Sequence, residues 1–252
     1  MVISAALAAL ALQSSSLIKV DEPLPAESRL SFEDYLPRAG VYCHPDWHTW
    51  GAGVIEDGGQ FRMAIARWPR AVGFPGWLTH SQADLASSPS PQGPYHHTAT
   101  LLESGGDQIT VHNPKLKKFE GEYFLYYIST RSKVLHTELV EIARTGYSHA
   151  RWGELRTNQR TFVASSKSLA GPYTRPANSL IEPSGPITTL TVNPAITRGP
   201  DGRYLLVVKG DKPNETRFIR DQAVAIGGSP TGPFKMQSKP VIDTFDSEDM
   251  SI

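Results

Sequence analysis

The chain has 252 residues and equal numbers of basic and acidic side chains, 25 of each, so its formal net charge is zero. A neutral chain lacks the basic excess typical of proteins that bind nucleic acid or an anionic membrane, and we expect neither partner. The 21 glycines and 20 prolines predict many turns and short strands rather than long helices. The single cysteine, Cys43, excludes an intramolecular disulfide and a cysteine-based zinc cage.

The N-terminal segment differs in composition from the rest of the chain. Residues 2–12 are almost wholly small and apolar, and residues 13–16 are polar. This pattern resembles a secretory signal peptide, and the apolar run is too short to span a bilayer. No Lys or Arg precedes the run, so a frayed apolar helix on a cytoplasmic protein is the alternative. We expect a signal peptide over 1–20, a linker over 21–38 and one domain of a secreted or periplasmic protein over 39–252.

The body of the chain contains short runs rich in β-branched and aromatic residues, and Gly or Pro separates nearly all of them. Such runs predict short strands. The exception is the segment 137–146, which predicts a short helix or an insertion loop. The predicted strands include residues 53–55, 61–66, 123–128, 161–165, 204–209 and 223–226.

An internal repeat is the clearest signal in the sequence. A Gly-Pro-aromatic element occurs at residues 93–95, 171–173 and 232–234. An Asn-Pro element at 113–114 and 193–194 interleaves with it, and a glycine-containing hairpin and a strand follow each copy. A single Gly-Pro would indicate only a turn. Three copies in phase with a second element indicate a repeated unit of roughly 60 to 80 residues and about four strands, which is typical of a propeller blade. The predicted fold class is therefore all-β, with a β-propeller architecture.

The order of the motifs resembles that of one group of enzymes. The motifs include Trp50-Gly51, Asp57-Gly58, Ala66-Arg67-Trp68-Pro69, His112-Asn113-Pro114, Asn193-Pro194, Asp201-Gly202-Arg203-Tyr204 and Ser247-Glu248-Asp249. They are similar to those of five-bladed β-propeller glycoside hydrolases of the family 43-like group, over residues 39–252. The resemblance implies an axial pocket, of which this chain supplies about three and a half blades, and hence a C-terminally truncated sequence. It also implies hydrolysis of an O-glycosidic bond in a carbohydrate, with inversion.

Corresponding positions in the repeats supply the candidate site residues, because the inner strands of a propeller meet at its axis. They are Trp50, His112, Asn113, Asn193, Glu248 and Asp249. Glycoside hydrolysis needs two carboxyl groups, one of which protonates the leaving oxygen. Glu248 falls on the general acid of the resembled group, and burial in a pocket would raise its pKa as that role requires. A solvated acidic turn over 246–249 is the alternative.

The second carboxyl group is less defined. In the resembled family an Asp-Pro opens the first blade and another supplies an aspartate that tunes the acid. Here Gly51 or its neighbours occupy the first position, and Asn193-Pro194 occupies the second. Asp46 and Asp107 are the two candidates for a catalytic base: Asp46 directly precedes the first inner strand, and Asp107 lies five residues before His112, where the resemblance to family 43-like sequences implies an aspartate. For both, turn capping by a local side-chain bond is the alternative.

The remaining candidates concern sugar binding. Trp50 is expected to stack on a sugar ring, although tryptophans are more often core residues. Arg67 is expected either to clamp a hydroxyl or carboxylate group or to brace two blades. His112 is a ligand for sugar hydroxyls or a proton-transfer residue, or else a satisfied core histidine, and Asn113 and Asn193 are either site residues or architectural. No metal ligands are spaced for a transition metal, and we expect no cofactor apart from the option of a structural calcium ion in the channel.

Three functions fit these features to different degrees. The first is a propeller glycosidase. The second is a non-catalytic carbohydrate-binding propeller, which the replaced Asp-Pro elements favour and Glu248 opposes. The third is a propeller phosphorylase, which would need basic residues gathered around a phosphate site; Arg67 and Lys209 alone do not provide it.

Overall fold

The computed structural model describes residues 41–215 and 219–241, which belong to the unit that begins at Ala39. The predicted signal peptide and linker lie outside this part, as do Glu248 and Asp249. The described residues form antiparallel sheets with few helices, which confirms the predicted all-β class.

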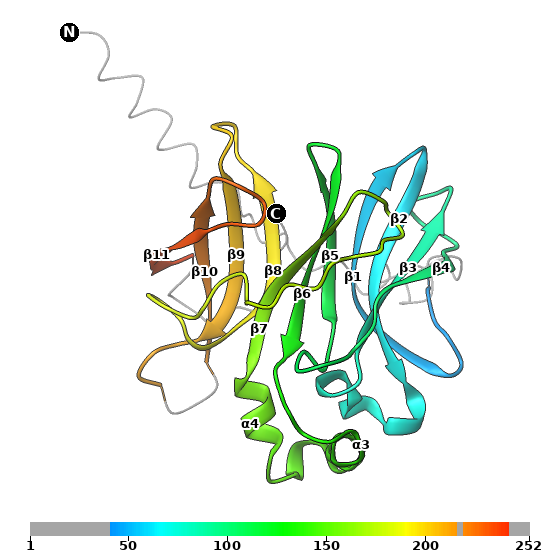
Figure 1. The fold of residues 1–252 in the computed structure, drawn as a ribbon, viewed down its shortest axis with the longest axis vertical. Helices are drawn as coiled ribbons and strands as arrows, with labels where there is room; N and C mark the ends of the chain where they lie inside the picture. Colours follow the sequence, from blue (N-terminus) through cyan, green and yellow to red (C-terminus); the bar gives the residue numbers. More distant parts are fainter. Residues whose placement is uncertain (1–40, 216–218, 242–252) are drawn as a thin grey trace, which may run out of the picture. The chain divides into compact units, whose positions relative to one another are not determined.

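Three sheets follow one another along the chain (Figure 1). In the first and third sheets each strand pairs with its neighbour in sequence, and the second has three such strands. The segment after the second sheet adds only isolated bridges, Ser165 with Thr174 and Thr161 with Ile181. The first sheet comprises β1 (Trp47–Asp57), β2 (Gln60–Pro69), β3 (Gln82–Ser88) and β4 (His96–Leu102). The second comprises β5 (His112–Phe119), β6 (Glu122–Thr130) and β7 (Gln159–Ser166). The third comprises β8 (Thr188–Arg198), β9 (Tyr204–Asp211), β10 (Arg220–Gly227) and β11 (Phe234–Pro240).

The Gly-Pro-aromatic repeat occupies the same place in each unit. It follows β3, β7 and β10, the third strand of each sheet. Its glycine has a positive φ of 88°, 93° and 83° at Gly93, Gly171 and Gly232, and each Gly-Pro bond is cis. The tyrosine hydroxyls of the first two copies each donate to the carbonyl four residues earlier. The repeat found in the sequence is therefore a repeat in space.

The first strand of each sheet carries a bulge at an equivalent position. The register shifts between Trp50 and Gly53 in β1, and at corresponding points in β5 and β8. At these bulges Gly51, Asn113 and Asn193 have positive φ values of 61°, 45° and 51°. The proline after each asparagine favours an extended or turn backbone. The observed conformation is left-handed instead, which asparagine tolerates better than most residues and a bulge can require.

The core lies between the sheets, and β6 contributes to both interfaces. Leu125 and Tyr127 pack toward β2, β3 and β5 residues such as Leu85 and Leu116. Their neighbours in sequence, Phe124 and Tyr126, belong to the cluster with the third sheet. Side chains of a strand alternate between its faces, so a strand covered on both faces reads as a continuous apolar run. This is why residues 123–128 gave a strong strand signal.

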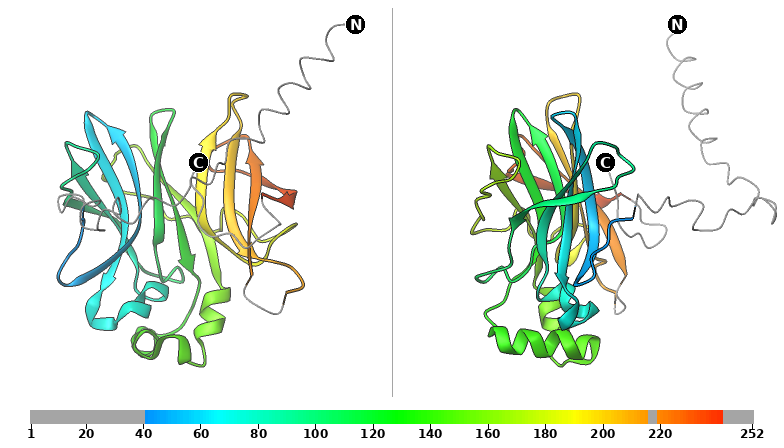
Figure 2. Two further views of the ribbon diagram at one scale, coloured as in Figure 1. Left: turned by 180° about the vertical axis from the view of Figure 1, so that it is seen from behind. Right: turned by 90° about the vertical axis from the view of Figure 1, so that its right-hand side faces the viewer.

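The helical segments gather at one end of the sheets (Figures 1 and 2). They are the 3-10 turns η4 (Arg70–Val72), η5 (Phe74–Leu78) and η6 (Gly146–Ser148), and the helices α3 (His136–Thr145) and α4 (Trp152–Thr157). Apolar side chains of η5, α3 and α4 form one cluster. The helix option for residues 137–146 is thus confirmed. Within the described residues, no helix is long and apolar enough to cross a membrane.

Candidate functional site

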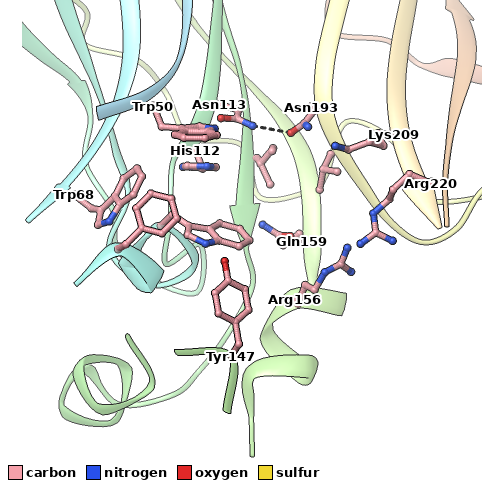
Figure 3. Close-up of a pocket in the computed structure, with 14 residues that line it drawn as sticks. Trp50, Trp68, His112, Asn113, Tyr147, Arg156, Gln159, Asn193, Lys209 and Arg220 are labelled. Atoms are coloured by element: carbon pink, nitrogen blue, oxygen red, sulfur yellow. Dashed lines mark hydrogen bonds between the residues drawn. The ribbon is translucent and has the colours of Figure 1, made fainter. Parts of the chain in front are cut away.

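A cavity of about 500 Å³ opens at the helical end, and all three sheets contribute to its lining (Figure 3). The first sheet supplies two of its tryptophans, and η5 adds two further aromatic rings. The second and third sheets supply the residues at and beside their bulges. The lining residues are Trp50, Trp68, Phe74, Trp77, His112, Asn113, Ile128, Tyr147, Arg156, Gln159, Val192, Asn193, Lys209 and Arg220.

One side of the cavity is a wall of aromatic rings, here called the aromatic wall: Trp50, Trp68, Phe74 and Trp77. Trp68 is buried, and Trp50 and Phe74 are about half exposed, at 52% and 46%. The ring centroids of Trp50 and Phe74 lie 6.0 Å apart, and those of Trp68 and Phe74 lie 5.8 Å apart, both edge to face. Edge-to-face contacts stabilise such clusters. They hold the ring of Trp50 at the cavity, with about half of its surface exposed.

His112 lies next to this wall and is buried. Its ring contacts those of Trp68 and Trp77, with centroids 5.6 Å and 5.4 Å away. Its Nδ1 lies 2.9 Å from Ser81 Oγ, and that hydroxyl donates to the carbonyl of Val111 at 3.1 Å. Because Ser81 has a single hydroxyl proton, Nδ1 of His112 acts as the donor to Ser81 Oγ. In the neutral ring Nε2 is then the nitrogen that accepts a hydrogen bond.

The three bulges meet beside His112. Asn113 Nδ2 donates to Asn193 Oδ1 at 2.8 Å, which joins the second sheet to the third. A Cβ atom on Gly51 would lie only 2.0 Å from Asn113 Oδ1. The first sheet can therefore approach the amide only because its bulge residue is glycine. Any side chain at Gly51, an aspartate included, would not fit this arrangement.

The opposite side is basic, and Arg156, Lys209 and Arg220 form what we call the cationic wall (Figure 3). Lys209 is buried at the end of β9, and Arg220 begins β10. Asp211 lies between the two arginines: Arg220 pairs with it directly, and Arg156 Nη1 is 3.9 Å from its Oδ2. Side chains of these three residues are 12–18% exposed. Among the described residues, Asp211 is thus an ionic partner that both guanidinium groups share.

The cavity brings together four of the predicted site residues: Trp50, His112, Asn113 and Asn193. Sequence reasoning missed Arg156, Arg220, Tyr147 and Gln159. Arg156 lies on α4, within an insertion between β6 and β7 that has no counterpart in the repeat. Lys209 was recognised only as a basic residue too isolated to form a phosphate site.

Arg67 lies elsewhere, inside the first sheet. Its Nε is 2.5 Å from Asp84 Oδ2, and its guanidinium lies over the ring of Trp47 at 4.1 Å. Asp84 is fully buried and also lies 2.8 Å from His97 Nε2. Arg67 therefore connects strands β2, β3 and β4 of one sheet, and it is not among the residues that line the cavity. The contacts of Arg67 thus brace strands of a single sheet, not two blades as one alternative had it, and they do not form the clamp.

The two base candidates also lie outside the lining. Asp46 is exposed and precedes β1, where its amide donates to His44 Nδ1. Asp107 is half exposed in the loop before β5 and pairs with Arg131 at 3.1 Å. Glu248 and Asp249 fall outside the described residues. Across 41–215 and 219–241, no group of three or more His, Cys, Asp or Glu side chains could hold a metal ion.

Comparison with known proteins identifies relatives by fold alone. No family model and no curated protein matches the sequence. The structure is similar to a family 117 glycoside hydrolase from the marine bacterium Zobellia galactanivorans, with a TM-score of 0.59, 16% identity, and coverage of 79% of this chain and 58% of that one. An endo-arabinase from Bacteroides thetaiotaomicron is similar with a TM-score of 0.55 and 16% identity, over 77% of this chain and 62% of that one. Fructan 1-exohydrolase IIa from Cichorium intybus is similar with a TM-score of 0.58 and 17% identity, over 79% of this chain and 33% of that one.

The chain thus has the fold of β-propeller glycoside hydrolases similar to families 43 and 117. It spans about three-fifths of the length of the first two neighbours.

Proposed function

We propose that the protein is a glycoside hydrolase that cleaves an O-glycosidic bond in an oligo- or polysaccharide. The observation that carries this proposal is the cavity, where equivalent positions of three successive sheets meet beside an exposed tryptophan. Ligand sites are typically concave and apolar, with a few polar groups that fix orientation. Trp50 stacks on the sugar ring in this proposal, and His112, Asn113 and Asn193 bond its hydroxyls. The fold neighbours, which are glycoside hydrolases, support the reaction type.

The proposed mechanism is inverting and uses two carboxyl groups. Glu248 protonates the leaving oxygen, and Asp249 bonds the substrate nearby. For the base that activates water the sequence offers Asp46 and Asp107, both of which lie outside the described lining of the cavity. In an inverting enzyme the two carboxyl groups lie about 6.5–9.5 Å apart to admit that water. Glu248→Gln, Asp46→Asn and Asp107→Asn assign these roles by their effects on kcat.

The setting of the enzyme is part of the same proposal. The complete propeller has five blades, and the protein is secreted or periplasmic after removal of residues 1–20. Hydrolysis by two carboxyl groups needs no cofactor. Mass spectrometry of the mature protein tests the processing, and a mature chain that retains Met1 would contradict it.

A carbohydrate-binding propeller without catalytic activity is the second candidate. The observation that favours it is that the described residues lining the cavity include no Asp or Glu. A site of this composition can hold a sugar through stacking and hydrogen bonds, whereas hydrolysis needs carboxyl groups from elsewhere in the chain.

A substrate screen separates the two candidates. The full chain is incubated with a panel of aryl-glycosides and oligosaccharides, and the anomeric configuration of the first product is followed by NMR. If the protein is the proposed hydrolase, we expect release of a sugar whose anomeric configuration is inverted. Oligosaccharide binding with no cleavage of any panel member would instead establish the binding protein.

A further inference from the structure

We propose that Gln159 selects the hydroxyl pattern of the bound sugar, through hydrogen bonds between its side-chain amide and two adjacent hydroxyl groups of one ring. This inference rests on the proposed function and adds a requirement on the substrate, which is a sugar unit with a free vicinal diol. The observation that carries it is a buried amide at the cavity to which no other described residue makes a hydrogen bond.

Gln159 is held firmly at the cavity. It is the first residue of β7, and its backbone pairs with Thr130 of β6. Only 4% of its surface is exposed, yet its side chain lines the cavity, and Figure 3 shows that side chain between the aromatic wall and the cationic wall. Because the strand fixes the backbone, little conformational freedom remains to be lost when the amide binds a ligand.

Two other buried glutamines show what distinguishes this amide. Gln108, which is 2% exposed, donates from Nε2 to the carbonyl of Pro176 and accepts at Oε1 from the hydroxyl of Tyr127. The amide of Gln222 is enclosed by protein, where no ligand reaches it. Gln159 alone of these three lines the cavity, and within the described part of the chain nothing satisfies its amide. A buried polar group without a partner costs stability, so its presence in a native structure calls for an explanation.

The chemistry of an amide identifies the group that fits it. Its oxygen accepts hydrogen bonds, its nitrogen donates them, and the two atoms lie side by side. A hydroxyl group both donates and accepts, so two adjacent ring hydroxyls match the amide whichever way it is turned. A deoxy position or an ether in place of one hydroxyl leaves one amide atom unpaired. That unpaired atom acts against the wrong sugar.

Two kinds of contact in the cavity therefore respond to different features of a sugar. Stacking on Trp50 depends on the apolar face of the ring, which a deoxy sugar retains. The bonds to Gln159 depend on two free hydroxyl groups, and a deoxy sugar keeps only one of them. Trp50 thus binds sugars in general, whereas Gln159 is a specificity-determining residue.

The test is NMR titration of the full chain with matched sugars. The probes are the methyl glycosides of D-glucose, D-galactose, D-xylose and L-arabinose, each beside its monodeoxy derivatives. We expect at least one parent glycoside to bind, and two of its derivatives, deoxygenated at neighbouring carbons, to bind about tenfold or more weakly. In Gln159→Leu the parent should lose about this factor. The two derivatives should stay within about twofold, because the bond they keep is offset by the amide atom they leave unpaired.

Thermal unfolding separates selection from a structural role. Gln159→Leu replaces an amide that lacks a partner with an apolar side chain of similar size, so the melting temperature without sugar should stay the same or rise. Gln108→Leu is the matched control, since Gln108 is equally buried but does not line the cavity. It removes the partner of Tyr127, so its melting temperature should fall while the preference for the parent glycoside stays within about twofold.

The outcomes are distinct. Equal binding of parent and deoxy glycosides by the wild type overturns this inference and leaves the proposed function standing. A preference that Gln159→Leu keeps in full would assign the selection to other residues and contradict the inference. A fall in melting temperature as large as that of Gln108→Leu would show that the amide is structural. No binding of any glycoside overturns the proposed function and this inference with it.

Discussion

The aromatic and cationic walls of the cavity are built in different ways. The aromatic wall comes from one continuous stretch, β1 to η5, and rings that contact one another hold it in place. The cationic wall is assembled from α4, β9 and β10, and its two arginines share a partly buried aspartate, Asp211, as an ionic partner. The first is held by local packing of rings, whereas the second includes an ionic group shared between segments that lie far apart in the sequence. Removing Asp211 should therefore disturb the cationic wall more than removing one ring disturbs the aromatic wall.

Asp211→Asn is the most damaging change we expect for this comparison. It leaves two largely buried guanidinium groups without the carboxylate between them, and breaking a buried pair typically costs about 3 to 5 kcal/mol. Chemical denaturation should show a fall of this size in the free energy of unfolding. Asp201→Asn, at an exposed pair with Arg203, is the control and should leave the free energy of unfolding nearly unchanged, because solvent screens exposed ion pairs. Similar losses for both variants would show that Asp211 does not organise the wall.

Gly51→Ala tests the meeting point of the three bulges. The new Cβ would collide with Asn113, whose amide is held by Asn193, and a positive φ adds strain. We expect a loss of about 1 to 3 kcal/mol in denaturation. Gly58→Ala is a matched control, because Gly58 has the same φ of 61° and open space around it. It reports the strain alone, so equal losses would mean that the close approach to Asn113 carries no cost.

Trp50→Ala should weaken the aromatic wall without unfolding the protein. Half of this side chain is already exposed, so stability should change little. Its stacking face is lost, and we expect a dissociation constant for oligosaccharides about tenfold higher, by calorimetry. Trp50→Phe should recover part of the affinity. Unchanged binding in Trp50→Ala would remove this residue from the site.

The smallest effect concerns pH and the helical end. Burial and the neighbouring His136 lower the pKa of His80 to about 4, whereas an unfolded histidine titrates near 6.5. Between these values the unfolded chain takes up a proton that the folded chain does not, so stability falls as the pH falls from about 6.5 to 4. His80→Gln should flatten this part of the stability curve, and His96→Gln, on the exposed part of β4, should not. An unaltered slope in His80→Gln would contradict the assignment.

The sequence predicted the parts of this structure that its repeats mark. Equivalent repeat positions placed Trp50, His112, Asn113 and Asn193 around one cavity. The repeats did not indicate Arg156 or Arg220, because Arg156 lies in an insertion and Arg220 lies outside the repeated motifs. Arg67 shows a second limit. Its residue type suits both a clamp and a brace, and only the pairing of β2 with β3 reveals that its partner is Asp84.

The central claim, hydrolysis by a propeller glycosidase, is tested most directly by Glu248→Gln on two leaving groups. General acid catalysis is typically worth about 10² to 10⁴ in rate. The variant should lose about this factor in kcat on an unactivated glycoside, and far less on a dinitrophenyl glycoside, whose leaving group needs no proton. Glu141→Gln, on the exposed face of α3, should match the wild type on both. Unchanged kcat of Glu248→Gln on the unactivated glycoside would contradict the account.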